Sequence, residues 1–112
     1  NPAPSDQPVY ECVAQNPKNL DRCSFDRDRG VAASGAPAAR QAAGEVPGAS
    51  VADLTPTICP DGRRCAVVIG NVLVYRQSSH LTKSFVESAE AQLSAALFAA
   101  TKGAFGEALP AG

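Results

Sequence analysis

The chain has 112 residues, enough for one small domain. Its hydrophobic share of 45% comes mostly from alanine and valine, with four Phe, two Tyr and neither Trp nor Met, so the core that it can bury is thin. The net charge of −1 with no basic run argues against nucleic-acid binding, and no apolar run approaches the roughly 20 residues of a direct membrane span.

The N-terminal quarter contains proline-rich and turn-forming segments. The opening NPAPSDQP has no signal peptide and is typical of a mature or truncated start. Residues 1–11 carry three prolines, which predicts an extended or loose segment, and residues 1–7 are assigned to an N-terminal extension. Residues 12–23 form a loop bracketed by two cysteines, with Asn16-Pro17 as a turn signal.

An Ala- and Arg-rich stretch, residues 26–44, follows. Asp26 or Asp28 can cap a helix, but the sequence Ser-Gly-Ala-Pro at 34–37 interrupts the pattern and predicts two shorter helices, the second ending at Gly44. Residues 45–48 form a turn. The partial alternation of residues 49–54 then predicts a short strand that Thr55-Pro56 closes.

The second half of the chain carries the clearest patterns. Residues 65–75 are rich in β-branched side chains and are interrupted by Gly70-Asn71, which predicts a hairpin or two short strands. A long amphipathic helix is expected over residues 79–101, capped by Ser78 or Ser79 and ended by Gly103. Its apolar stripe consists of Leu81, Phe85, Ala89, Leu93 and Leu97. Residues 103–112 are expected to be a loose tail.

The four cysteines indicate the compartment. They permit three pairings; the pairs closest in sequence are Cys12 with Cys23 and Cys59 with Cys65, and each would close a short polar loop. The C-x2-C spacing of zinc sites is absent, so zinc is the weaker alternative, and free buried thiols are another. Two disulfides indicate an oxidising, extracytoplasmic setting.

Helices alternating with a few short strands predict the α/β class. Three short strands and one good helix leave sheet edges uncovered. We therefore expect the chain to be part of a larger α/β unit or to pack on a partner. The alternative is an α+β mini-domain held together by its disulfides.

The only histidine, His80, lies between the β-rich run and the last helix. An imidazole there is suited to acid–base chemistry, because its ordinary pKa is close to neutral pH. The simpler interpretation is a surface or capping histidine at the start of a helix.

The order of these features resembles the C-terminal part of SGNH (GDSL-like) hydrolase domains, in particular those fused to bacterial acyltransferase-3 type membrane proteins. The stretch that carries the resemblance is ICPDGRRCAVVIGNVLVYRQSSHLT, followed by the amphipathic helix. In that subgroup a Cys pair, a β run ending in Tyr-Arg, an Asp-x-x-His-Leu-Thr motif and a final helix occur in this order. The resemblance implies a partial three-layer, flavodoxin-like SGNH unit, which we assign to residues 8–102.

The resemblance assigns His80 the role of the catalytic base that accepts a proton from a serine nucleophile. Gln77 stands where the family has Asp. A carboxylate there would orient the imidazole and stabilise its charged form, whereas an amide can orient the ring but cannot neutralise it. Asp53 is another candidate carboxylate, although an Asp before Leu-Thr-Pro is more typical of a turn.

The nucleophile of the family has no counterpart in this sequence, since neither Gly-Asp-Ser nor Gly-x-Ser-x-Gly occurs. The resemblance therefore implies the His-bearing portion of an extracytoplasmic esterase or O-acyltransferase that acts on envelope glycan or lipid. The rest of the domain, or a partner chain, would supply the serine, and no cofactor is implied. The alternatives are a catalytically silent binding module and an accessory subunit that docks on a membrane-protein complex of the cell envelope.

Overall fold

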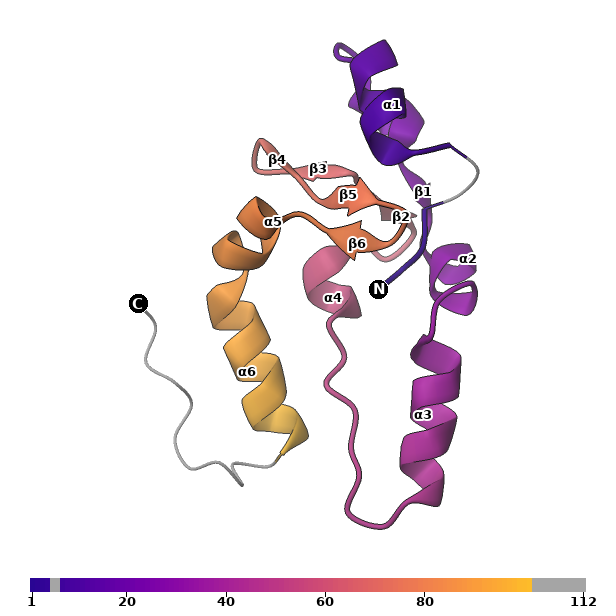
Figure 1. Ribbon diagram of the computed structural model, residues 1–112, viewed down its shortest axis with the longest axis vertical. Helices are drawn as coiled ribbons and strands as arrows, with labels where there is room; N and C mark the ends of the chain where they lie inside the picture. The colour runs from indigo at the N-terminus through magenta and orange to yellow at the C-terminus, as the bar shows by residue number, and fades with distance from the viewer. Residues whose placement is uncertain (5–6, 102–112) are drawn as a thin grey trace.

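A computed structural model gives the structure of residues 1–4 and 7–101; the predicted tail at 103–112 lies outside this description. The helices are α1 (Val9–Gln15), the 3-10 turn η1 (Leu20–Cys23), α2 (Arg27–Ala32), α3 (Ala36–Glu45), α4 (Thr55–Ile58), α5 (Lys83–Ser88) and α6 (Glu90–Ala100). The strands are β1 (Phe25–Asp26), β2 (Arg64–Cys65), β3 (Val68–Ile69), β4 (Val72–Leu73), β5 (Tyr75–Gln77) and β6 (His80–Leu81). This mixture of helices and short strands confirms the α/β prediction (Figure 1).

The strands form three antiparallel pairs, β1–β2, β3–β4 and β5–β6. Val74, between β4 and β5, joins the last two pairs. Its N–H donates to the carbonyl of Val67, which precedes β3, and its carbonyl accepts the N–H of Thr82, which follows β6. Residues 67–82 therefore run as one small meander. Its first turn uses Gly70-Asn71, and the positive φ angles of 55° and 62° confirm the predicted turn dipeptide.

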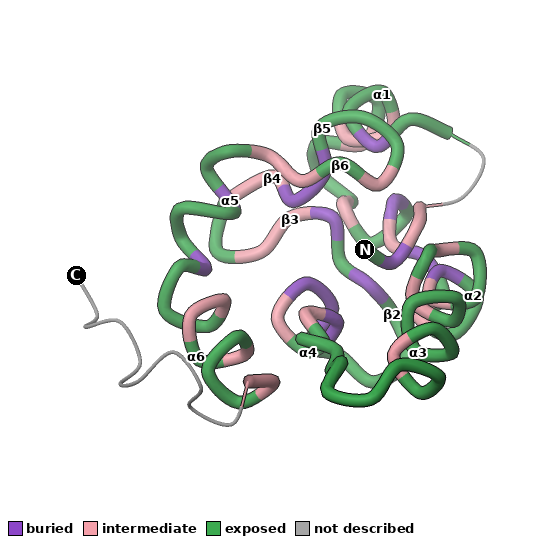
Figure 2. The backbone as a smooth tube through the Cα atoms, turned by 60° about the horizontal axis from the view of Figure 1, so that its bottom comes forward, coloured by how far each residue is buried: buried purple, intermediate pink, exposed green. Residues whose placement is uncertain are grey.

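The core is small and lies where the meander meets α1, α4 and α5. Its largest fully buried side chains include Tyr75, Ile58, Val67 and Val74. The Phe25 and Tyr75 rings pack edge to face with centroids 5.7 Å apart. Figure 2 shows the buried segments gathered at the centre of the molecule, with exposed chain around them, as expected from the shortage of bulky side chains.

Two disulfides join the cysteines that are closest in sequence. Cys12 in α1 bonds to Cys23 at the end of η1, and Cys59 bonds to Cys65 in β2. Cys59 and Cys65 are themselves part of the core, with 1% and 0% of their surfaces exposed. The loop predicted between Cys12 and Cys23 contains helix as well as turn, since α1 extends to Gln15.

The predicted division of residues 26–44 into two helices is confirmed. Asp26 caps α2 by accepting the N–H of Arg29, 2.8 Å away, and α3 begins after a corner at residues 33–35. Figure 1 shows α3 and α6 extending from the strands on the same side, with residues 46–54 running back between them. Neither α3 nor α6 contains a buried residue.

Two local predictions were wrong. Residues 49–54 are not a strand: none of the strands among the described residues pairs with them, and the chain turns at Asp53 into α4, with Pro56 in the first turn of that helix. The final helix does not begin at residue 79 and is not continuous. His80 and Leu81 pair with β5 instead, Thr82 is the N-cap of α5, and Ala89 separates α5 from α6 with φ −100° and ψ 10°.

Candidate functional site

The two predicted catalytic positions lie side by side at the tip of the β5–β6 hairpin. A two-residue turn, Ser78-Ser79, brings Gln77 and His80 into direct register across the strands. Opposed residues of an antiparallel pair have Cβ atoms about 4.5–5.5 Å apart, so the two side chains are within reach of each other. Both are exposed to solvent.

Buried and capped residues hold this hairpin tip in place. Tyr75 at the start of β5 is completely buried and stands opposite Leu81 of β6. Thr82, directly after β6, accepts the N–H of Phe85 with its hydroxyl and donates that hydroxyl to the carbonyl of Leu73. The imidazole therefore projects from a strand pair fixed both to the core and to the first turn of α5.

The chain's first residue also reaches the hairpin tip. The Asn1 side-chain amide donates to the carbonyl of Ser79, 3.0 Å away. Ala3 in the same segment donates its N–H to the carbonyl of Gly30 at 2.9 Å. The N-terminal segment, expected to be loose, is thus tied down at two points, and nothing in its composition indicated this.

The arrangement of Gln77 and His80 supports proton transfer only in part. The Gln77 amide can orient the imidazole through a hydrogen bond, but an uncharged group does not stabilise the imidazolium that forms when the ring accepts a proton. Ser78, at the turn, adopts a left-handed φ of 49°, so Ser78 shapes the turn and does not cap a helix as predicted.

A family model described as SGNH domain (fused to AT3 domains) matches residues 1–95. The chain belongs to the SGNH family. No curated protein and no solved structure matches it. The match contains both cysteine pairs and the whole of the β5–β6 hairpin, so Gln77 and His80 lie in the part of this SGNH domain that the family describes.

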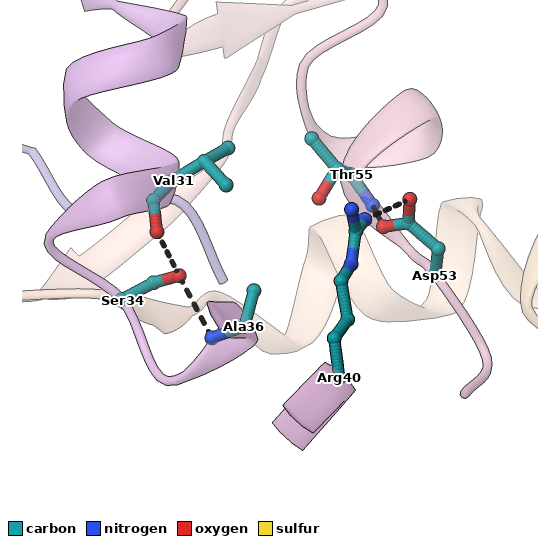
Figure 3. A network of polar contacts seen from close by, with 6 residues as sticks. All are labelled: Val31, Ser34, Ala36, Arg40, Asp53 and Thr55. Carbon is teal, nitrogen blue, oxygen red and sulfur yellow. Dashed lines mark hydrogen bonds and ion pairs between the residues drawn. The ribbon is translucent and has the colours of Figure 1, made fainter. Parts of the chain in front are cut away.

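The SGNH domain has a second polar cluster, at the junction of α3 and α4 (Figure 3). Arg40 of α3 donates to the Asp53 carboxylate at 2.8 Å, and the other oxygen of that carboxylate accepts the Thr55 N–H at 3.0 Å. The Thr55 hydrogen bond is the main reason why the pKa of Asp53 lies below its usual value, and Arg40 and Arg27 act in the same direction. The predicted turn role of Asp53 fits these contacts.

Among residues 1–4 and 7–101 of this SGNH domain, no group of three His, Cys, Asp or Glu side chains is placed to hold a metal ion. Within the same range, no helix combines the length and apolar character needed to cross a bilayer. The order of motifs in the sequence predicted Gln77 and His80 as site residues; the structure brings them together across the hairpin, and their catalytic role stays a prediction. Sequence reasoning missed Asn1 and Arg40, because each acts on a residue far away along the chain.

Proposed function

We propose that this chain is the His-bearing portion of an extracytoplasmic SGNH-type esterase or O-acyltransferase acting on cell-envelope glycan or lipid. His80 is the general base, and Gln77 is the residue that orients it. The serine nucleophile comes from a segment outside this sequence. Residues 8–102 form the C-terminal part of the domain in this proposal.

The observation that carries the proposal is the exposed His80 at the end of an anchored hairpin, with Gln77 opposite it in register. A base that must accept a proton from another segment has to present its ring outwards while its backbone stays fixed. The core contacts of Tyr75 and the hydrogen bonds of Thr82 supply that fixed backbone.

The chemistry proceeds by two displacements. The serine oxygen attacks the ester carbonyl as its proton moves to the His80 ring; the tetrahedral intermediate then expels the alcohol, which takes that proton and leaves an acyl-serine. A water or an acceptor hydroxyl next gives its proton to the same ring and attacks the acyl group; the second tetrahedral intermediate then expels the serine oxygen, which takes the proton back from the ring, and the acid or the new ester is released. Loss of a carboxylate charge in a comparable triad lowers turnover by about 10⁴, so Gln77 predicts a slow enzyme.

Two facts support the proposed cellular compartment and partner. Both cysteine pairs are disulfides, which persist in oxidising compartments. The family's domains are fused to AT3 domains, so a neighbouring region of protein is expected next to this one. These facts support our proposal that the protein works outside the cytoplasm, against a membrane-protein complex.

The test compares variants of the full-length protein expressed in its native cell. His80→Ala should lower hydrolysis of p-nitrophenyl acetate and the acyl content of the envelope by at least about 10². Gln77→Asp should raise turnover, because it restores the charge that stabilises the imidazolium. Arg76→Gln changes an exposed residue of the same strand and serves as the control, with activity unchanged.

Gln77 also favours a second function, a catalytically silent SGNH domain that binds an envelope component or serves as an accessory subunit. In that case His80→Ala and Gln77→Asp would both leave ester hydrolysis and acyl content at the level of the unchanged protein. Such a result would contradict the enzymatic proposal and leave docking as the function to be tested by crosslinking in cells.

A further inference from the structure

The β5–β6 hairpin has two features that weaken its own control over the direction of the His80 side chain. Ser78, in the turn, adopts a φ of 49°, a backbone conformation that glycine and asparagine favour over serine. The pairing is also irregular between Tyr75 and Gln77, where β5 places three residues opposite the two of β6. Tyr75 and Thr82 anchor the base of the hairpin, but the turn lies beyond both. A contact from outside the hairpin can therefore decide how the imidazole is presented.

The N-terminal segment supplies such a contact. The Asn1 side-chain amide donates to the carbonyl of Ser79 at 3.0 Å, a bond between residues 78 positions apart. The backbone behind Asn1 is fixed, because the Pro2 side chain is fully buried. The next residue, Ala3, donates its N–H to the carbonyl of Gly30 at 2.9 Å. Proline restricts its own φ and the conformations of the residue before it, so few backbone arrangements are open to Asn1.

The segment fits closely against α2 because residue 30 is glycine. A Cβ at that position would lie 3.1 Å from the carbonyl oxygen of Ala3 and 2.7 Å from the Phe25 ring. The Phe25 ring in turn packs against Tyr75, the first residue of β5. The support of Asn1 and the base of the hairpin therefore rest on the same buried residues, and the core sets the distance between them.

We propose that Asn1 is a positioning residue for His80, an inference that rests on the proposed role of His80 as general base. The Ser79 carbonyl and the His80 N–H belong to one planar peptide unit. The hydrogen bond to that carbonyl limits rotation of the plane, and so holds the direction in which the His80 side chain leaves the backbone. Gln77 acts from across the strand pair, whereas Asn1 acts on the backbone of the turn. A misplaced base slows proton transfer, because the reaction depends on close alignment of the reacting groups.

The kinetic test uses ester hydrolysis by the full-length protein. Asn1→Ala should lower kcat about fivefold with KM unchanged, since it removes one hydrogen bond that matters only for the chemical step. Asn1→Gln keeps an amide donor on a longer side chain and should restore part of the loss. Asn16→Ala is the matched control: it removes an amide bond of the same kind, to the Cys12 carbonyl at 2.9 Å, and should leave kcat unchanged.

A double-mutant cycle separates positioning from a general loss of stability. In a His80→Ala background, Asn1→Ala should have no further effect on kcat, because its influence passes through the missing ring. An equal loss with and without His80 would overturn the proposal.

The contact itself is tested without reference to activity, by NMR of the full-length protein labelled with isotopes at histidine. The backbone amide signal that His80→Ala removes belongs to His80, and Asn1→Ala should move or broaden it while Asn16→Ala does not. An unmoved signal overturns the proposal. If the signal moves but His80→Ala leaves hydrolysis unchanged, the proposed function fails, whereas Asn1 still orients His80.

Discussion

The strand end of the molecule, made of α1, α4, α5 and the six strands, differs from the helical end, made of α3, α6 and residues 46–54, in what each buries. The strand end contains the core and both disulfides. The helical end is held by single polar contacts, including Arg40 with Asp53 and the Ser50 hydroxyl with the carbonyl of Ala100. A chain poor in large apolar side chains has concentrated them at the end that carries His80.

This contrast has a consequence for the site. The β5–β6 hairpin, which carries Gln77 and His80, begins at the buried Tyr75, so the geometry of the hairpin depends on the core. The Arg40–Asp53–Thr55 cluster lies where the two ends meet and depends on helix positions that the core does not fix directly. The two sites should therefore respond differently to substitutions.

The largest expected effect is at Tyr75. Tyr75→Ala should lower the free energy of unfolding by about 3–5 kcal/mol, because it leaves a cavity beside Phe25. Tyr75→Phe is the control: the hydroxyl is buried without a hydrogen-bond partner among the described residues, so its removal should be neutral or stabilising by up to about 1 kcal/mol. Denaturant unfolding measures both, and equal losses would contradict the assignment of Tyr75 to the core.

Tyr75 also predicts a pH dependence. Burial raises the pKa of its phenol above the ordinary value of 10.0. A group whose folded-state pKa is raised contributes stability that is complete below the unfolded pKa and is lost as the pH rises towards the folded value. The free energy of unfolding should therefore decrease above about pH 10. For the Tyr75→Phe variant it should decrease less steeply over the same pH range.

The disulfides come next. Replacing Cys12 and Cys23 by Ser should cost about 2.8 kcal/mol from loop entropy, and replacing Cys59 and Cys65 about 2.2 kcal/mol from the same source, since their sequence separations are 11 and 6. The second pair is also buried, so its replacement by Ser should cost more than the entropy alone, and Ala should be better tolerated there. Equal losses for Ser and Ala at 59 and 65 would show that these positions do not belong to the core.

Two glycine substitutions should act in opposite directions, one in α2 beside the core residue Phe25 and one in α3 of the helical end. A Cβ on Gly30 would lie 2.7 Å from the Phe25 ring and 3.1 Å from the carbonyl oxygen of Ala3, so Gly30→Ala should cost about 1–3 kcal/mol. Gly44, inside α3, has open space around it, and Gly44→Ala should stabilise by about 0.5–1 kcal/mol. Thermal unfolding of the two variants tests the contrast most directly. A loss of stability in both variants would show that α3 is packed against other residues.

The smallest effect is expected at Arg40. Its ion pair with Asp53 has side chains that are 55% and 41% exposed, so Arg40→Gln should cost at most about 1 kcal/mol, and less in high salt. The Lys83–Glu87 pair, with 88% and 67% exposed, provides the control, and Lys83→Gln should change stability by less than Arg40→Gln. A cost of several kcal/mol for Arg40→Gln would show that the helical end is more tightly held than its burial indicates.

Local signals in the sequence predicted the features that depend on neighbouring residues. The Gly70-Asn71 turn and the corner before α3 are marked by residues with restricted or unusual backbone preferences, so they could be read directly. The cysteine pairs closest in sequence are also those that bond.

The errors occurred where strand pairing or packing, which periodicity does not report, decides the conformation. His80 and Leu81 fit the start of a helix by periodicity, but pairing with β5 takes precedence, and Thr82 then caps the helix two residues later. Leu97 continues the apolar stripe, yet it is 51% exposed because α6 diverges from the core after Ala89. Periodicity shows which face of a helix is apolar and says nothing about whether a surface lies opposite it.

The hydrogen bond from Asn1 to Ser79 gives the molecule a built-in attachment point. Position 1 is thereby held next to the residue that precedes His80 in the chain. A cysteine placed there and labelled with a fluorophore would report on the environment of the imidazole with no substitution in the hairpin itself.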